Sequence, residues 1–135
     1  MKTTKITCFL NGDGEANIIY GDEFESFGSE YYRGVLKEKH NKENKEFDVV
    51  IANPPFSVEC FKKTFENGAK DFELFNALGD RGDDIECLFI ERTAQLLKDD
   101  GVAAIILPST ILTNGGIHSK ARRLFIESIQ MKSLD

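Results

Sequence analysis

Apolar and polar positions alternate along the chain in blocks that predict strands and helices in turn. Two apolar runs, at residues 47–52 and 102–107, are short, nearly continuous and rich in branched side chains. Such runs are typical of strands covered on both faces in a parallel sheet. A weaker run at residues 17–20 leads to Gly21 and Asp22 and predicts a third strand with a polar C-terminal end.

Apolar residues recur at helical spacing in two longer segments. The first helix is predicted to begin at Ile85, with Asp83 or Asp84 as its N-cap, and to end at Gly101 in the C′ position. The second helix is predicted at residues 117–128.

Weaker signals complete the order of elements. Residues 1–10 are predicted to end a helix at the turn residues 11–14, and residues 57–65 to form another helix. Residues 23–46 are polar, and residues 67–84 are rich in Gly and Asp. The run KEKHNKENKE at residues 37–46 is predicted as a solvated loop or the end of a helix, and residues 67–84 are predicted as a long surface loop.

The alternation of strands and helices predicts an α/β domain with a mainly parallel sheet. The strands at residues 47–52 and 102–107 are expected to lie side by side, joined by one right-handed crossover through the helix between them. Only three strands are predicted, below the usual number of about five or six, and no Gly-rich turn follows a first strand. We therefore expect one partial domain over residues 1–135, with no second domain, whose sheet leaves an edge and an apolar face uncovered.

Composition and charge narrow the class of protein. Hydrophobic residues make up 41% and charged residues 30% of the chain, as in ordinary globular domains. No apolar run approaches the roughly 18 residues of a membrane span, and the N-terminal residues are too polar for a signal peptide. Cys8, Cys60 and Cys87 lack metal-ligand spacing, which indicates reduced thiols in a cytoplasmic protein. The net charge of −6 disfavours a protein that binds nucleic acid over its whole surface. It is compatible with binding through a local basic patch.

Three predicted strand ends carry residues suited to ligand binding. In open α/β sheets, ligands bind beyond the carboxyl ends of the strands. Asp22, Asn53 and Pro108 stand at or just beyond the ends of the three predicted strands. The predicted domain therefore has its candidate site at this edge.

The strand end with the most candidate ligand-binding residues lies in the segment DVVIANPPFS. The Asn53 amide oxygen and the Pro54 carbonyl can both accept hydrogen bonds, and together they suit the two N–H bonds of one exocyclic amine. Pro54 and Pro55 make the backbone rigid, and Phe56 is suited to stack on the ring that bears the amine. An amine held in this way keeps electron density on nitrogen and can attack an electrophilic methyl group.

The same residues resemble a known family. FDVVIANPPF closely resembles the signature of amino-group methyltransferases, Asp/Asn-Pro-Pro-Tyr/Phe after a parallel strand. FLNGDGEANIIYGDEF is similar to the segment that precedes this signature in the modification subunits of type I restriction systems. DIECLFIERTAQLLKDDGVAAIILPSTIL and GGIHSKARRLFIE are similar to the segments that follow it. These matches cover most of the chain in the family's order.

The resemblance implies a partial Rossmann-like class I methyltransferase fold and a parent protein that is a DNA adenine-N6 methyltransferase. Such enzymes use S-adenosylmethionine and take a flipped adenine out of double-stranded DNA. The resemblance gives catalytic roles to Asn53, Pro54, Pro55 and Phe56, places Asp22 near the adenine of the cofactor, and implies specificity and restriction subunits as partners.

The family's Gly-rich cofactor loop and ribose-binding acid lie upstream of the residues that match here. We therefore expect the 135-residue chain alone to be inactive and to bind the cofactor weakly or not at all. The uncovered edge and face of its sheet are expected to drive self-association, most simply into a symmetric dimer.

Alternative interpretations stay open at this point. An RNA base or a protein glutamine amide presents a similar amino group, and a non-catalytic module that binds a partner or nucleic acid is compatible with the acidic charge. Asp22 suits a turn-capping carboxylate equally well. No metal site is predicted, because His40 and His118 have no convincing partners in the sequence. The basic cluster, formed by Lys120, Arg122 and Arg123, is interpreted as a solvated helix face.

Overall fold

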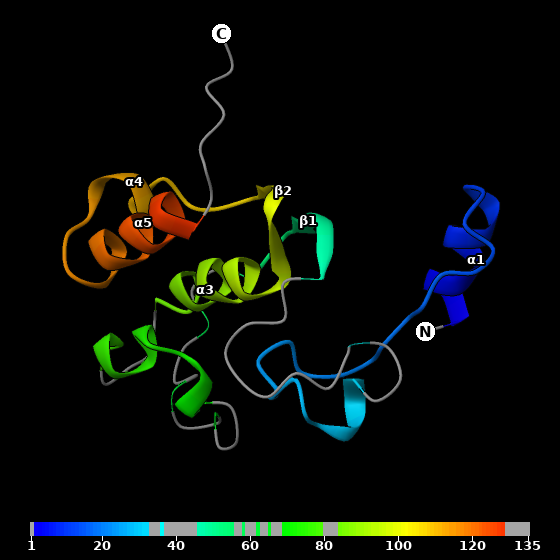
Figure 1. Ribbon diagram of the computed structural model, residues 1–135, viewed down its shortest axis with the longest axis horizontal. Coiled ribbons are helices and arrows are strands. Elements are labelled where there is room, and N and C mark those ends of the chain that lie inside the picture. The colour runs from blue at the N-terminus through cyan, green and yellow to red at the C-terminus, as the bar shows by residue number, and fades with distance from the viewer. Residues whose placement is uncertain are drawn as a thin grey trace, which may run out of the picture.

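The computed structural model describes residues 2–32, 36, 46–55, 58, 62, 65, 69–79 and 84–128. Helices and two strands follow one another along this part of the chain, as Figure 1 shows. The elements are, in chain order, α1 (Lys2–Leu10), the 3₁₀ helix η1 (Glu30–Tyr32), β1 (Phe47–Ala52), the 3₁₀ helices η2 (Ala69–Asp71) and η3 (Leu74–Ala77), α3 (Glu86–Leu96), β2 (Leu97–Ile105), α4 (Thr110–Thr113) and α5 (Ile117–Ser128). The helix predicted at residues 57–65 falls mostly outside the described residues.

The two strands form a small parallel sheet, which confirms the predicted mixed architecture and the predicted pairing. Val50 pairs with Ala103 and Ala52 with Ile105, so the carboxyl ends of β1 and β2 lie at the same edge. β1 has the predicted bounds, whereas β2 begins earlier than predicted and ends at Ile105. The assignment to a partial Rossmann-like methyltransferase fold stays a prediction.

An irregularity near the start of β2 explains its early beginning. Phe47 pairs with Leu97 and Val49 with Val102, so β2 has extra residues between these two pairs. The predicted C′ role of Gly101 is wrong, because α3 ends at Leu96 and Leu97 is already extended (φ −79°, ψ 133°). A Cβ atom on Gly101 would lie 2.6 Å from Leu97 Cδ1 and 3.0 Å from the Lys98 carbonyl oxygen. Glycine is therefore suited to this position because the chain passes close to itself.

The core lies around α3, which contacts both strands and packs against α5. Every residue of α3 from Glu86 to Thr93 is buried, including several polar ones. The buried apolar residues of the core cluster come from most of the described chain and are Phe24, Phe65, Phe72, Leu74, Leu78, Ile85, Cys87, Leu88, Phe89, Ile90, Ile111, Ile117 and Ala121. One continuous core therefore supports the sheet from the side of α3.

A segment of polar composition and a segment predicted as a surface loop both contribute to this core. Phe24 is only 2% exposed, and its ring centroid lies 4.5 Å from that of Phe89 and 5.4 Å from that of Phe72. In the second segment, η2 and η3 bury Phe72 and Leu74, and the Glu91 carboxylate accepts hydrogen bonds from the Glu73 and Leu74 backbone N–H groups (2.6 and 3.0 Å). The surface-loop prediction is therefore wrong for Phe72 and Leu74, because tertiary contacts bury these apolar side chains within a segment rich in Gly and Asp.

No strand forms at residues 17–20, so the third predicted strand is wrong. Tyr20 is 81% exposed, and the sheet of the described residues consists of β1 and β2 alone. A short apolar run becomes a strand only where a neighbouring strand satisfies its backbone hydrogen bonds.

The predicted stop of α1 is confirmed. Gly12 has a positive φ of 90°, its N–H donates to the Phe9 carbonyl (3.1 Å), and the Asp13 N–H donates to the Cys8 carbonyl (2.9 Å). These two bonds form a Schellman motif with glycine at C′. Figure 1 shows α1 apart from the sheet and the other helices.

One face of the sheet is apolar and uncovered by the described residues. On β1, Val49 is 59% and Ile51 81% exposed, and on the same side Val102 of β2 and Ile106, the residue after β2, are exposed. The prediction that these strands are covered on both faces is therefore wrong within the described chain, whereas the predicted uncovered apolar face is present. None of the described helices is long and apolar enough to cross a membrane.

Candidate functional site

The segment Asn53–Pro55 begins where β1 ends, at the carboxyl edge of the parallel pair. The Ile106 N–H donates to the Ala52 carbonyl (3.0 Å), which continues the pairing one step beyond β2. Pro108 and Ser109 lie beyond the carboxyl end of the neighbouring strand, which ends at Ile105. The fold thus brings the Asn53 and Pro108 ends to one edge, as predicted from parallel pairing.

Asn53 and the two prolines differ in their surroundings. Asn53 is exposed, and among the described residues its side-chain amide makes no hydrogen bond. Pro54 is buried and Pro55 is exposed, so the backbone is anchored immediately beside an open amide. Phe56 lies outside the described residues. An amide fixed at a rigid strand end can accept a hydrogen bond from an incoming amino group.

Asp22 lies in a turn at the surface. Its Oδ1 accepts a hydrogen bond from the Phe24 N–H (2.9 Å), and its carbonyl accepts from Glu25 N (3.2 Å) and from the Tyr32 hydroxyl (3.2 Å). These bonds are those of a turn-capping carboxylate. Among the described residues, no hydrogen bond or ion pair joins Asp22 to Asn53–Pro55. Its assignment to the cofactor therefore stays a prediction.

Arg92 of α3 holds this turn against the core. Its Nη2 donates to the Glu25 carbonyl (2.9 Å), and its guanidinium lies 4.3 Å from the Phe27 ring centroid and 4.6 Å from that of Phe72. Burial lowers the pKa of Arg92, and nearby Tyr32 and carboxylates act in the opposite direction. A buried cation between two aromatic rings thus fixes the turn that carries Asp22.

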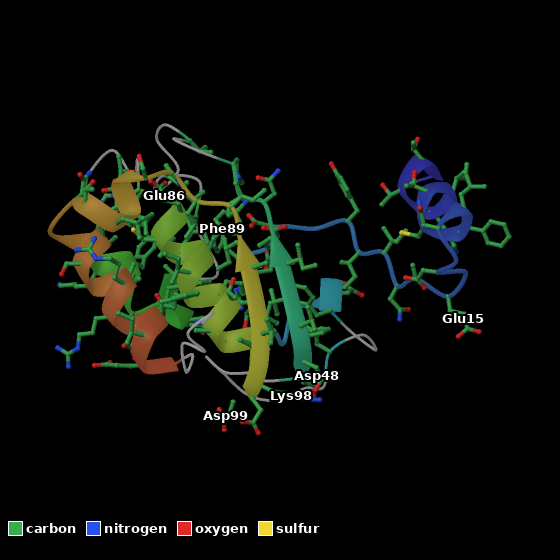
Figure 2. The ribbon with its side chains drawn as sticks, turned by 90° about the horizontal axis from the view of Figure 1, so that it is seen from above. Glu15, Asp48, Glu86, Phe89, Lys98 and Asp99 are labelled. Carbon is green, nitrogen blue, oxygen red and sulfur yellow. The ribbon has the colours of Figure 1, made fainter. Side chains whose placement is uncertain are left out.

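The structure also brings together residues that were not predicted to meet. His118 Nε2 lies 3.4 Å from Asp84 Oδ1 and 3.9 Å from Glu86 Oε1. Asp84 therefore faces His118, and Ile85, not Asp84, stands at the N-cap of α3; Asp83 lies outside the described residues. His118 is far from both acids in sequence, so only the packing of α5 on α3 reveals this cluster, which we call the His118 cluster. Figure 2 labels Glu86 at the start of α3.

The basic cluster is not a uniform solvated face. Arg122 Nη1 donates to the carbonyl oxygens of Ile111 and Asn114, the latter at 2.8 Å, and so secures the end of α4. Arg123 is exposed and forms an ion pair with Glu127 on the same helix (2.7 Å). The interpretation as a solvated face therefore holds for Arg123 but not for Arg122.

Comparison with known proteins adds an independent finding. The family model described as "Eco57I restriction-modification methylase" matches residues 3–135. The Type II restriction enzyme and methyltransferase RM.Eco57I of Escherichia coli is 24% identical over 112 residues, which cover 73% of this chain and 10% of that protein. The chain thus spans about a tenth of the length of this relative. No solved structure matches the chain significantly.

Proposed function

Because the chain belongs to the Eco57I restriction-modification methylase family, we propose that it supplies the amine-binding part of a DNA adenine-N6 methyltransferase. The observation that carries this proposal is the position of Asn53–Pro55, directly after a parallel strand at the ligand-binding edge of the sheet. The proposed substrate is an adenine flipped out of double-stranded DNA, because a base within the duplex cannot reach such an edge. A cytoplasmic location is part of the proposal, since cellular DNA would be the substrate.

The roles of the chain's own residues follow from hydrogen-bond chemistry. The Asn53 amide oxygen and the Pro54 carbonyl would accept the two N–H bonds of the adenine amino group. Positive charge develops on this nitrogen as it forms its new bond to carbon, and two fixed carbonyl dipoles stabilise that charge. Pro55 limits the backbone motion that would misalign the acceptors, and Phe56 would stack on the base.

The proposed cofactor is S-adenosylmethionine, which supplies the methyl group when bound. Asp22 is the described residue proposed to contact it. The Asp22 carboxylate is exposed, and its turn is held by Arg92, so it fits a hydrogen-bond donor such as an amino or hydroxyl group. Asp22 Oδ1 already accepts a hydrogen bond from Phe24 N. A donor group of the cofactor would therefore bind mainly at Oδ2.

The type of restriction-modification system is a finer part of the proposal. The resemblance to type I modification subunits predicts separate specificity and restriction subunits. The relative from E. coli is named a Type II restriction enzyme and methyltransferase. This name favours a parent protein that combines both activities over one that depends on separate subunits, and purification of the intact gene product would distinguish them.

The gene product that contains this chain should transfer labelled methyl groups from S-adenosylmethionine to DNA. Nucleoside analysis should find the label in N6-methyladenine. Asn53→Ala should lower the turnover number by roughly a hundredfold, the usual effect of removing one preorganised polar group that stabilises a transition state.

The matched control is Asn76→Ala, which removes the same side chain from an exposed position in η3. This variant should keep wild-type activity. Label found only in RNA or in protein glutamine would favour the alternative methyltransferases, and equal activity of Asn53→Ala and Asn76→Ala would contradict the proposed role of Asn53.

A further inference from the structure

The His118 cluster joins the beginnings of two packed helices. Asp84 and Glu86 lie at the start of α3, and His118 is the second residue of α5. One ligand atom from each of the three side chains can be chosen so that all three atoms lie within 4.8 Å of one another. Glu86 and His118 are 4% and 5% exposed, so this is a largely buried grouping of two carboxylates and an imidazole.

Glu86 carries a polar atom that the described residues leave unsatisfied. Its Oε2 is buried and has no hydrogen-bond partner, while its Oε1 lies 3.9 Å from His118 Nε2, beyond hydrogen-bond distance. A buried carboxylate without a partner is strongly unfavourable, because burial removes its hydration. Arg122 does not supply the missing contact, since its Nη1 donates to backbone carbonyls.

A divalent metal ion fits the donor types and the distances. Imidazole nitrogen and carboxylate oxygen bind Zn²⁺ at about 2.0–2.2 Å, which places neighbouring donors about 3.4 Å apart in tetrahedral geometry. The observed separation from His118 Nε2 is 3.4 Å to Asp84 Oδ1 and 3.9 Å to Glu86 Oε1. The donor atoms of all three side chains lie within 4.8 Å of one another, so closing to the tetrahedral separation requires a contraction of at most about 1.4 Å.

We propose that Asp84, Glu86 and His118 bind a divalent transition-metal ion of the Zn²⁺ class. The ion would neutralise the two clustered carboxylates, and binding by both Glu86 oxygens would also satisfy the orphaned Oε2. Three protein donors leave at least one position for water, so the site is exchangeable. By joining His118 to Asp84 and Glu86, the ion would tie the start of α5 to the start of α3. This inference does not depend on the proposed methyltransferase activity.

Calorimetric titration of Zn²⁺ into the chelator-treated 135-residue chain tests the proposal. One Zn²⁺ should bind per chain, and binding should raise the thermal unfolding temperature. Glu86→Gln and His118→Gln should each weaken Zn²⁺ binding by at least about tenfold. The matched controls are Glu127→Gln, an exposed acid on α5, and His40→Gln, which removes the other histidine of the chain.

Stability measurements separate metal binding from a merely structural role. Glu86→Gln keeps the size of the side chain and removes the buried charge, so without metal this variant should be at least as stable as the wild type. With saturating Zn²⁺ the order should reverse, because only the wild type gains from binding. This reversal is expected even if His118→Gln fails to fold.

Co²⁺ substitution identifies the donors. A low-coordinate site of nitrogen and oxygen donors should give Co²⁺ visible bands stronger than those of the aqueous ion, and at limiting Co²⁺ this enhancement should be smaller in Glu86→Gln than in the wild type. An intense sulfur-to-metal charge-transfer band would assign the ion to a cysteine and overturn the proposal. Absence of saturable binding, or equal affinity of Glu86→Gln and Glu127→Gln, would overturn it as well and leave the cluster as an ion pair only.

Discussion

Gly101 is a position where one added carbon atom would collide with the core. A Cβ there would lie 2.6 Å from the Cδ1 and 2.7 Å from the Cγ of Leu97, which is buried. Gly101→Ala should therefore lower the free energy of unfolding by about 1–3 kcal/mol, as overpacking usually does. Urea unfolding followed by far-ultraviolet circular dichroism measures this change.

Gly28→Ala provides the control, because a Cβ at Gly28 meets nothing within 4 Å. Its effect should stay within about 0.5 kcal/mol, as for ordinary surface substitutions. If both alanine variants unfolded at the same urea concentration, the close approach at Gly101 would not affect the free energy of unfolding.

Cys87 is predicted to be chemically inert in the folded chain. Burial, with smaller contributions from Glu86 and Asp84, raises the pKa of its thiol from 9.0 to about 12. The thiolate fraction at pH 8.5 should thus be lower by roughly a thousandfold than for an ordinary thiol. Iodoacetamide should label Cys8, which is partly exposed, long before Cys87, and mass spectrometry of the peptides should show comparable labelling in denaturant.

The same pKa shift has a defined effect on stability. The folded state holds the thiol proton more tightly than the unfolded state, so this stabilisation is fully present below about pH 9 and is lost as the pH rises towards 12. Rapid labelling of Cys87 at pH 8.5 without denaturant would contradict the buried environment.

The functional role of a single residue could be predicted from the sequence only where the residues next to it in the chain belong to the same site. Asn53, Pro54 and Pro55 are consecutive, so their place at a strand end could be predicted from the run before them. The donors of the His118 cluster come from two helices, and nothing in their separate surroundings signals their meeting. The local sequence predicts Asp83 or Asp84 as the N-cap of α3, whereas Ile85 stands there and Asp84 lies beside His118.

At the scale of elements, the Glu91 side chain of α3 caps the start of the neighbouring helix η3. Its carboxylate lies on α3 and accepts the Glu73 and Leu74 N–H groups at the start of η3. Glu91→Gln should lower the free energy of unfolding by about 1.5–3 kcal/mol, because charge-assisted hydrogen bonds in a buried site are replaced by neutral ones. Glu127→Gln, at an exposed ion pair, should cost at most about 1 kcal/mol. An equal effect of the two substitutions would show that the cap is unimportant.

Elements with a strong internal pattern could be predicted, and those that depend on distant partners could not. The strand at residues 47–52 and the helix at residues 117–128 have the predicted bounds. The run at residues 17–20 has no partner strand among the described residues, so its apolar character does not produce a strand. The burial of Phe72 and Leu74 could not be predicted, because the sequence around them is rich in Gly and Asp. These two residues become buried because Phe24 and α3 pack against them.

At the scale of the whole molecule, the 135-residue chain alone is expected to bind S-adenosylmethionine weakly and to transfer no methyl groups. Among the described residues, Asp22 is the single candidate contact, and its Oδ1 already accepts a bond within its own turn. One partly occupied carboxylate is too little for tight binding of a molecule of this size. Calorimetry should show no saturation at micromolar cofactor, and a dissociation constant of about 1 μM, equivalent to roughly −8 kcal/mol, would contradict this expectation.

The uncovered sheet face should control the oligomeric state of the chain. Val49 and Ile51 on β1 adjoin Val102 on β2 and Ile106 just beyond it. Together they make a continuous apolar surface on the side of the sheet opposite α3. A contiguous apolar surface of this kind favours association, and two copies can cover it with one symmetric interface. The net charge of −6 opposes such association, and salt screens that repulsion.

Sedimentation at several concentrations, in about 0.15 M salt where charge repulsion is screened beyond roughly 8 Å, should therefore show a monomer–dimer equilibrium. Ile51→Lys should shift it to monomer without unfolding the chain, because Ile51 is 81% exposed and its replacement removes no core contact. Leu112→Lys places the same charge on an equally exposed apolar residue of α4 and should leave the dimer intact. A wild-type chain that stays monomeric at every concentration would mean that the apolar face alone is too small to hold two copies together.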